Sequence, residues 1–117
     1  MRVSPRDIYV ALWHNWIGQA HLLQSRVEEA VLWFEKARSA NSEHPIPHAY
    51  LASTYALKGE TESAAAELAQ ARKLSGDDRY SSLARLMAVG PLGGPKIREL
   101  FETTYFIGLR RAGMPEE

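Results

Sequence analysis

Apolar residues recur along this chain at helical spacing, and the segment 29–37 (EAVLWFEKA) shows the pattern most clearly. It contains no Gly or Pro, and most of its residues have high helix propensity. Ala30, Phe34 and Ala37 fall at i, i+4 and i+7, so they share one helix face. Such a face, with small residues around one large ring, is typical of a helix that packs closely against another helix.

The same pattern, with its caps and breakers, predicts about six helices. A helix start at Ser4–Pro5, a capping box formed by Ser25 and Glu28, and a stop at Gly59 mark three of the boundaries. The segment 90–95 breaks the chain before the last helix, and residues 114–117 are expected to fray. The expected helices cover about residues 5–23, 25–40, 45–58 (with a start at either Pro45 or Pro47), 60–74, 79–89 and 95–113.

The residue pattern around Ala30 recurs around Ala64, 34 residues later (64 − 30 = 34). This small/large/small pattern with a 34-residue period resembles the tetratricopeptide repeat over about residues 11–78. The chain departs from that pattern at His14 and His48, where the family often has Trp, and at His21, where it often has Tyr. The matched positions are Ile17/Leu51, Gly18/Ala52, His21/Tyr55, Ala30/Ala64, Phe34/Leu68 and Ala37/Ala71.

This resemblance implies an all-α fold, a tetratricopeptide-like α-α superhelix in a single domain of residues 1–117. The expected repeats are 11–44 and 45–78. The repeat register fails in the next segment, where Arg85 and Leu86 occupy the positions equivalent to Leu51 and Ala52. We therefore expect residues 79–113 to form a C-terminal helical pair that caps the open end of the solenoid.

Composition narrows the range of partners. The chain has 14 basic and 14 acidic residues, so no net charge favours nucleic acid or an anionic membrane, although a local patch of Arg98, Arg110 and Arg111 stays open as a possibility. There is no Cys, no apolar run of membrane-spanning length and no signal-peptide pattern at the N-terminus. We expect a cytoplasmic protein that binds neither membrane nor nucleic acid.

No arrangement of residues predicts catalysis. The four His residues lack metal-ligand spacing, and the segment 90–96 lacks the Lys-Ser/Thr pair and the free N–H groups of a phosphate-binding loop. There is no Cys, no GxSxG motif and no recognisable triad. We expect no enzyme activity, no metal and no cofactor.

The resemblance also implies a concave groove lined by the first helix of each repeat. Chaperone-binding members of the family use basic and amide residues there to hold a peptide carboxylate, and the groove of this chain has no Lys or Arg at those positions. A protein or a peptide with apolar or amide side chains is the expected ligand. The predicted groove residues are Leu12, Asn15, Gln19, Leu22, Ala49, Ser53 and Ala56.

Other aromatic and apolar residues suggest a second surface. Trp13 and Trp33 lie beside the repeat positions and are either core residues or contact anchors, whereas Trp16 is expected to pack inward. The segment 103–109 is apolar nearly all round, which predicts burial of Phe106 and Ile107 against another chain or domain. A homodimer formed through this last helix is therefore the alternative function.

The two ends of the chain carry a narrower resemblance. Residues 4–7 (SPRD) and 108–116 (GLRRAGMPE) look like the C-terminal repeat segment of bacterial multidomain signalling proteins, in which a nucleotide-cyclase or winged-helix domain precedes the repeats. By that resemblance the chain is a fragment of a larger protein. The predicted function is a protein–protein interaction or scaffolding module at the regulatory end of a bacterial signalling protein.

Overall fold

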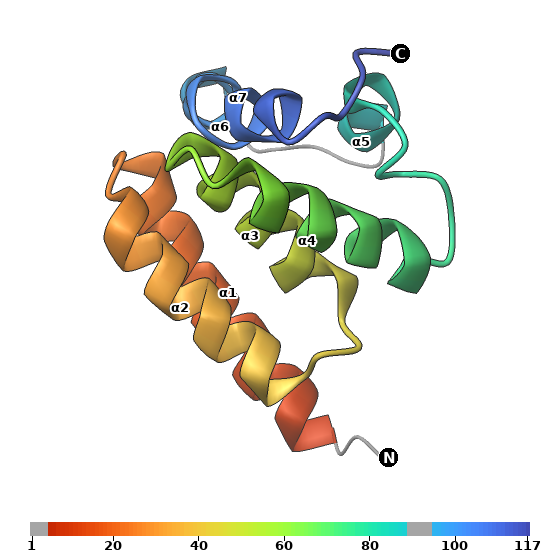
Figure 1. Ribbon diagram of the computed structural model, residues 1–117. Coiled ribbons are helices and arrows are strands. Elements are labelled where there is room, and N and C mark those ends of the chain that lie inside the picture. The colour runs from red at the N-terminus through yellow and green to blue at the C-terminus, as the bar shows by residue number, and fades with distance from the viewer. Residues whose placement is uncertain (1–4, 89–94) are drawn as a thin grey trace.

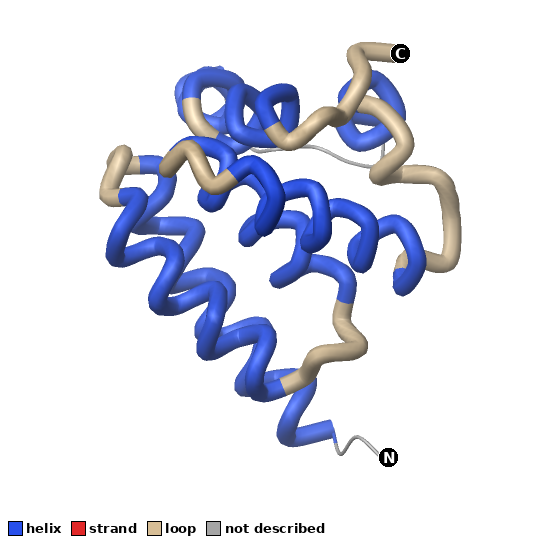
Figure 2. The backbone as a smooth tube through the Cα atoms, in the orientation of Figure 1, coloured by secondary structure: helices blue, strands red, loops and turns tan. Residues whose placement is uncertain are grey.

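The protein is all-α. The computed structural model describes residues 5–88 and 95–117, and these residues form helices and loops with no strand (Figures 1 and 2). This confirms the predicted all-α class. The helices are α1 (Pro5–Leu23), α2 (Val27–Ala40), α3 (Pro45–Leu57), α4 (Thr61–Leu74), α5 (Leu83–Ala88), α6 (Pro95–Thr103) and α7 (Tyr105–Arg111).

The first four helices form two hairpins, α1–α2 and α3–α4, each joined by a short turn (Figure 1). Close packing within the first hairpin depends on Gly18, since a Cβ atom there would lie 2.6 Å from the ring of Phe34. Ala30, Phe34 and Ala37 are all fully buried, as the apolar spacing predicts. The helix face formed by Ala30, Phe34 and Ala37 is therefore the face through which α2 packs against α1.

The second hairpin repeats this construction. Ala64, Leu68 and Ala71 on α4 are buried against α3, where Ala52 takes the place of Gly18. The hairpins meet where α3 packs on α2, and the rings of Phe34 and Tyr50 lie 5.0 Å apart there. One hydrophobic core thus runs through both hairpins.

The turns within the hairpins correct one predicted boundary. Ser25 has a positive φ of 62° and does not cap α2, whose N-cap residue, Arg26, makes no side-chain cap hydrogen bond. Gly59 holds the equivalent position in the second hairpin (59 − 25 = 34) with φ 87°. The predicted capping box of Ser25 and Glu28 is therefore wrong, because Ser25 has the left-handed conformation that the turn needs.

The segment after α4 also differs from the prediction. The expected helix over 79–89 begins only at Leu83, because Asp77 accepts hydrogen bonds from the Arg79 backbone and side chain and so holds a turn. The backbone N–H groups of Leu83 and Ala84 donate to the carbonyls of Pro115 and Glu116, at 2.9 Å each. The C-terminal residues are therefore attached to α5 rather than frayed.

The predicted last helix is two helices. The chain breaks at Thr104, where φ is −127° and ψ is −78°, and the Thr104 hydroxyl donates to the Leu100 carbonyl at 2.6 Å. This break allows α7 to lie along α3 (Figure 1). The second part of the predicted last helix, α7, therefore packs on the first helix of the second hairpin and has its main contacts there.

Candidate functional site

The α3 side of the predicted groove is closed by the chain itself. Ala49 and Ser53 are fully buried and Ala56 is 4% exposed. The Ser53 hydroxyl donates to the Tyr105 carbonyl of α7 at 2.8 Å, and the rings of Tyr50 and Tyr105 stack at 4.2 Å. Gly108 permits this approach, because a Cβ atom there would overlap the backbone of Ser53. These groove positions are not open to a peptide in this structure.

The α1 side of the groove is only partly accessible. Leu22 is fully buried, Asn15 is 2% exposed, and Leu12 and Gln19 are half-buried. Gln19 accepts a hydrogen bond from the Tyr50 hydroxyl at 3.0 Å, which ties α1 to α3. The amide oxygen of Asn15 has no hydrogen-bond partner among the described residues. Of the groove residues of α1, Leu22 thus belongs to the core and Gln19 serves the contact between the hairpins.

The neighbouring face of α1 is open and aromatic. Tyr9 is 72% exposed, and Trp13 and Trp16 are each 62% exposed. Their spacing of i, i+4 and i+7 places them on one stripe, which we call the aromatic face of α1. A pocket of about 320 Å³ lies beside it, lined by Trp13, Trp16, Ile17, Ala20, His21 and Gln24.

The sequence predicts only part of this face. It points to Trp13, but the expectation that Trp16 packs inward is wrong. Tyr9 is not among the predicted residues, although its spacing from Trp13 and Trp16 is visible in the sequence. Residues 8–23 of α1 also contain no Asp, Glu, Lys or Arg, which is unusual for a helix with an exposed side. Large rings without flanking charge mark an interaction surface.

The other predicted interface residues lie elsewhere. Trp33 is half-buried on α2; its ring centroid lies 5.5 Å from that of His14 and 4.3 Å from the Lys36 ammonium. Phe106 is 1% exposed and packs inside the chain beside Phe101 and Tyr105, while Ile107 is half-buried. The break at Thr104 explains why the segment 103–109 is so apolar, since α7 buries Phe106 within its own chain.

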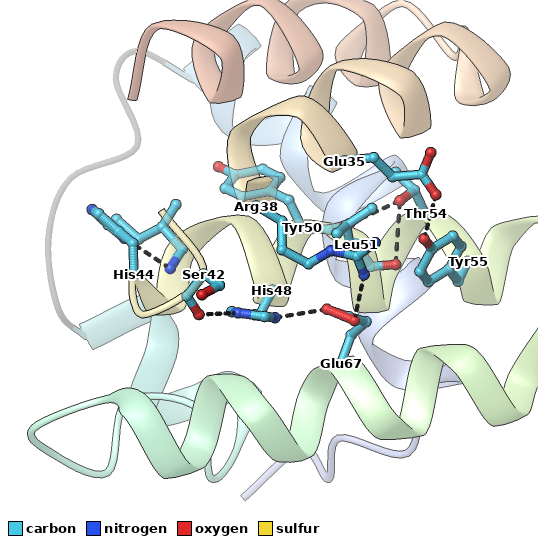
Figure 3. A network of polar contacts seen from close by, with 11 residues as sticks. Glu35, Arg38, Ser42, His44, His48, Tyr50, Leu51, Thr54, Tyr55 and Glu67 are labelled. Carbon is cyan, nitrogen blue, oxygen red and sulfur yellow. Dashed lines mark hydrogen bonds and ion pairs between the residues drawn. The ribbon is translucent and has the colours of Figure 1, made fainter. Parts of the chain in front are cut away.

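A polar network joins three helices near the junction of the hairpins (Figure 3). The two ring nitrogens of His48 on α3 contact Glu67 Oε1 of α4 and the Ser42 carbonyl, at 2.7 Å each. Arg38 of α2 donates to the other oxygen of Glu67 at 2.8 Å. Both partners of the His48 ring are acceptors, so the geometry favours an imidazolium that donates from both nitrogens.

These contacts and the burial of the groups shift the pKa values of His48, Glu67 and Tyr55. Burial alone would lower the pKa of His48, but its hydrogen bonds to Glu67 and Ser42 raise the pKa above the ordinary value. Burial alone would raise the pKa of Glu67, but His48 and Arg38 hold the pKa below its ordinary value. Burial and a hydrogen bond to Glu35 raise the pKa of the Tyr55 hydroxyl to about 12. Glu67 is thus committed to its two cationic partners, which indicates a structural role.

Within the described residues 5–88 and 95–117, no three His, Asp or Glu side chains lie together as metal ligands would. None of the helices in these ranges combines the length and the apolar character that crossing a membrane requires.

Comparison with known proteins assigns the chain to no family. No protein-family model matches the chain, and neither the curated proteins nor the solved structures give a match.

Proposed function

We propose that this chain is a protein–protein interaction module of the helical-hairpin type, and that it binds its partner through the aromatic face of α1. The observation that supports this most is the exposure of Tyr9, Trp13 and Trp16 in one stripe. Trp and Tyr are the residues most often found at the energetic centres of protein interfaces. The proposal moves the binding surface from the groove to the neighbouring, exposed face of the same helix.

The size of the face supports a protein partner. Aromatic side chains bury roughly 150–250 Å² each when they are covered, and these three are about two thirds exposed. Covering them removes roughly 300–500 Å² of mainly apolar surface from water, which corresponds to about 8–12 kcal/mol of gross transfer free energy at ~25 cal/mol per Å². Part of this gain is lost to the entropy of association.

The polar groups of the core support a binding function over catalysis. The His48–Glu67–Arg38 network is internally paired, and it connects α2, α3 and α4 rather than pointing into a cleft. A catalytic site needs titratable groups that converge on a substrate. The network is better suited to fixing the two hairpins relative to each other, so that α1 presents its outer side.

The cellular role of the module is proposed from a resemblance of its two ends. The ends of the chain look like the C-terminal repeat segment of bacterial multidomain signalling proteins, and on that basis the module acts in regulation or scaffolding. The alternative of a homodimer through the last helix has less support, because Phe106 is buried within its own chain.

Site-specific photo-crosslinking tests the proposed surface. A benzophenone amino acid placed at Trp13 should give one discrete adduct in the cells that make the protein. The same group at Glu29, an exposed residue of α2, should give none. The adduct from position 13 should disappear when Trp16→Glu is added to the same chain.

Two results would contradict the proposal. One is the absence of any adduct from position 13. The other is an adduct that forms from Gln19, on the groove side of α1, and survives Trp16→Glu. The first result would exclude the aromatic face as the binding surface. The second would show that the partner binds on the groove side of α1.

A further inference from the structure

The 34-residue register relates the two exposed Trp positions of α1 to buried positions of α3. Trp13 and Trp16 correspond to Pro47 and Tyr50 (47 − 13 = 34 and 50 − 16 = 34). Pro47 is less than 2% exposed and Tyr50 is 9% exposed. Tyr50 is covered in part by the preceding hairpin, through Phe34 of α2 and Gln19 of α1. The aromatic face of α1 is therefore the side on which a preceding hairpin would pack.

The other end of the repeat has a matching open side. Val31, Glu35 and Arg38 of α2 lie toward the second hairpin: Val31 is buried, Glu35 accepts from Tyr55, and Arg38 pairs with Glu67. The equivalent positions of α4 are Ala65, Ala69 and Arg72 (65 − 31, 69 − 35 and 72 − 38 are each 34), and all three are exposed. We call these residues the alanine face of α4.

The two open faces differ in size in a complementary way. At the junction inside the chain, α2 contributes the long Glu35 side chain, and α3 contributes the smaller Pro47 beside the large Tyr50. At the open ends α4 offers Ala69 in place of Glu35, and α1 offers Trp13 in place of Pro47, while Trp16 is a large ring like its equivalent Tyr50. Large rings opposite short side chains allow two helices to approach and interdigitate.

We infer that the occupant of the aromatic face is a second copy of this chain, and that α1 of one copy packs on the alanine face of α4 of the next. The contact continues between copies the arrangement that α2 and α3 have within one copy. This inference rests on the proposed function and specifies its partner. It also replaces the symmetric dimer through the last helix by a head-to-tail contact between different faces.

The chemistry of the two faces suits such a contact. Residues 8–23 of α1 carry no Asp, Glu, Lys or Arg, so the contact desolvates no charge on that side. On α4 the face includes one charged residue, Arg72, whose Nε already donates to the Tyr80 carbonyl, and the alanines are flanked by Glu62, Gln70 and Lys73, which are exposed and can stay hydrated at the rim.

The geometry also sets the strength and the form of the assembly. If both faces bury similar areas, the total is roughly 600–1,000 Å², which belongs to the weak and transient class of interfaces. A contact between two different faces does not close on itself when it merely continues a repeat, so it builds open chains. The average mass in solution should therefore rise gradually with concentration.

Mixing two variants tests this contact. Trp13→Glu/Trp16→Glu blocks the aromatic face, and Ala65→Glu/Ala69→Glu blocks the alanine face; all four positions are exposed, so circular dichroism should show an unchanged fold. Light scattering after size exclusion should give a mass for the native chain that rises with concentration. Each variant alone should be a monomer, and their mixture should form a dimer and nothing larger.

A matched control uses Leu32, an apolar residue of α2 that is 60% exposed and belongs to neither face. Leu32→Glu should leave the self-association of the native chain unchanged. The inference is overturned if the native chain stays a monomer at millimolar concentration, or if the mixed variants stay monomeric. It is also overturned if the α4 variant alone still forms dimers, because that result indicates a symmetric α1–α1 contact.

The two proposals can fail separately. If the native chain stays monomeric but forms a crosslink from position 13 to a different protein, the head-to-tail contact is excluded and the aromatic face is still an interaction surface. If the chain is monomeric and forms no crosslink, both proposals are excluded.

Discussion

Single small residues decide how closely the helices of this protein approach each other. Gly18 lies under the ring of Phe34, and Gly108 lies against the backbone of Ser53. The repeat pattern made the first of these contacts predictable, because Gly18 and Ala52 occupy the same small position. The second was not predictable, since nothing local indicates that residue 108 meets a residue of α3.

Gly108→Ala should destabilise the protein by roughly 3 kcal/mol, because the added methyl group overlaps the Ser53 backbone and α7 must move away from α3. Gly76→Ala is the matched control: a Cβ atom there meets nothing within 4 Å, and the change should alter stability by less than about 1 kcal/mol. Urea denaturation monitored by circular dichroism measures both. Equal effects of the two substitutions would show that α7 is not held against Ser53.

At the scale of the helices, the sequence predicted the two hairpins well and the C-terminal helices poorly. The spacing of Ala30, Phe34 and Ala37 and its repetition located α1 to α4 within a few residues. The last helix had a continuous apolar stripe, and only its contact with α3 shows why it breaks at Thr104. Contacts between residues more than 50 positions apart leave no periodic signal in a single sequence.

The network that joins α2, α3 and α4 should make stability depend on pH. The pKa of His48 is raised in the folded protein, so its contribution is complete below its ordinary value of 6.5 and is lost as the pH rises through the folded value. The pKa of Glu67 is lowered, so its contribution is present above its ordinary value of 4.5 and is lost as the pH falls through the folded value. Both contributions are complete between about pH 4.5 and 6.5.

The difference in unfolding free energy between the native chain and His48→Gln should therefore be larger at pH 5.5 than at pH 8. Urea titrations at both values measure it. In a Glu67→Gln background the same comparison should lose most of its pH dependence, because His48 then lacks its anionic partner. A difference that increases toward pH 8 would mean that His48 is neutral in the folded protein.

At the scale of the whole molecule, the predicted groove is closed along α3, and two outer helix faces are exposed. Helix α7 covers the groove side of α3, whereas the aromatic face of α1 and the alanine face of α4 stay exposed. The repeat resemblance pointed to the groove as the binding site, because it could not show that the chain fills part of that groove itself. The exposure of Trp16 was equally hidden, since it depends on which side of α1 a neighbouring hairpin occupies.

The most direct test of this account follows the indole N–H groups by NMR in a chain labelled with ¹⁵N at its three Trp residues. Single Trp→Phe variants assign the three resonances. As the concentration rises from micromolar to millimolar, the resonances of Trp13 and Trp16 should shift and broaden, while that of Trp33, which packs against His14, should stay in place as an internal control. Resonances that do not move, or a shift confined to Trp33, would contradict the claim that the aromatic face of α1 is where this protein meets its partner.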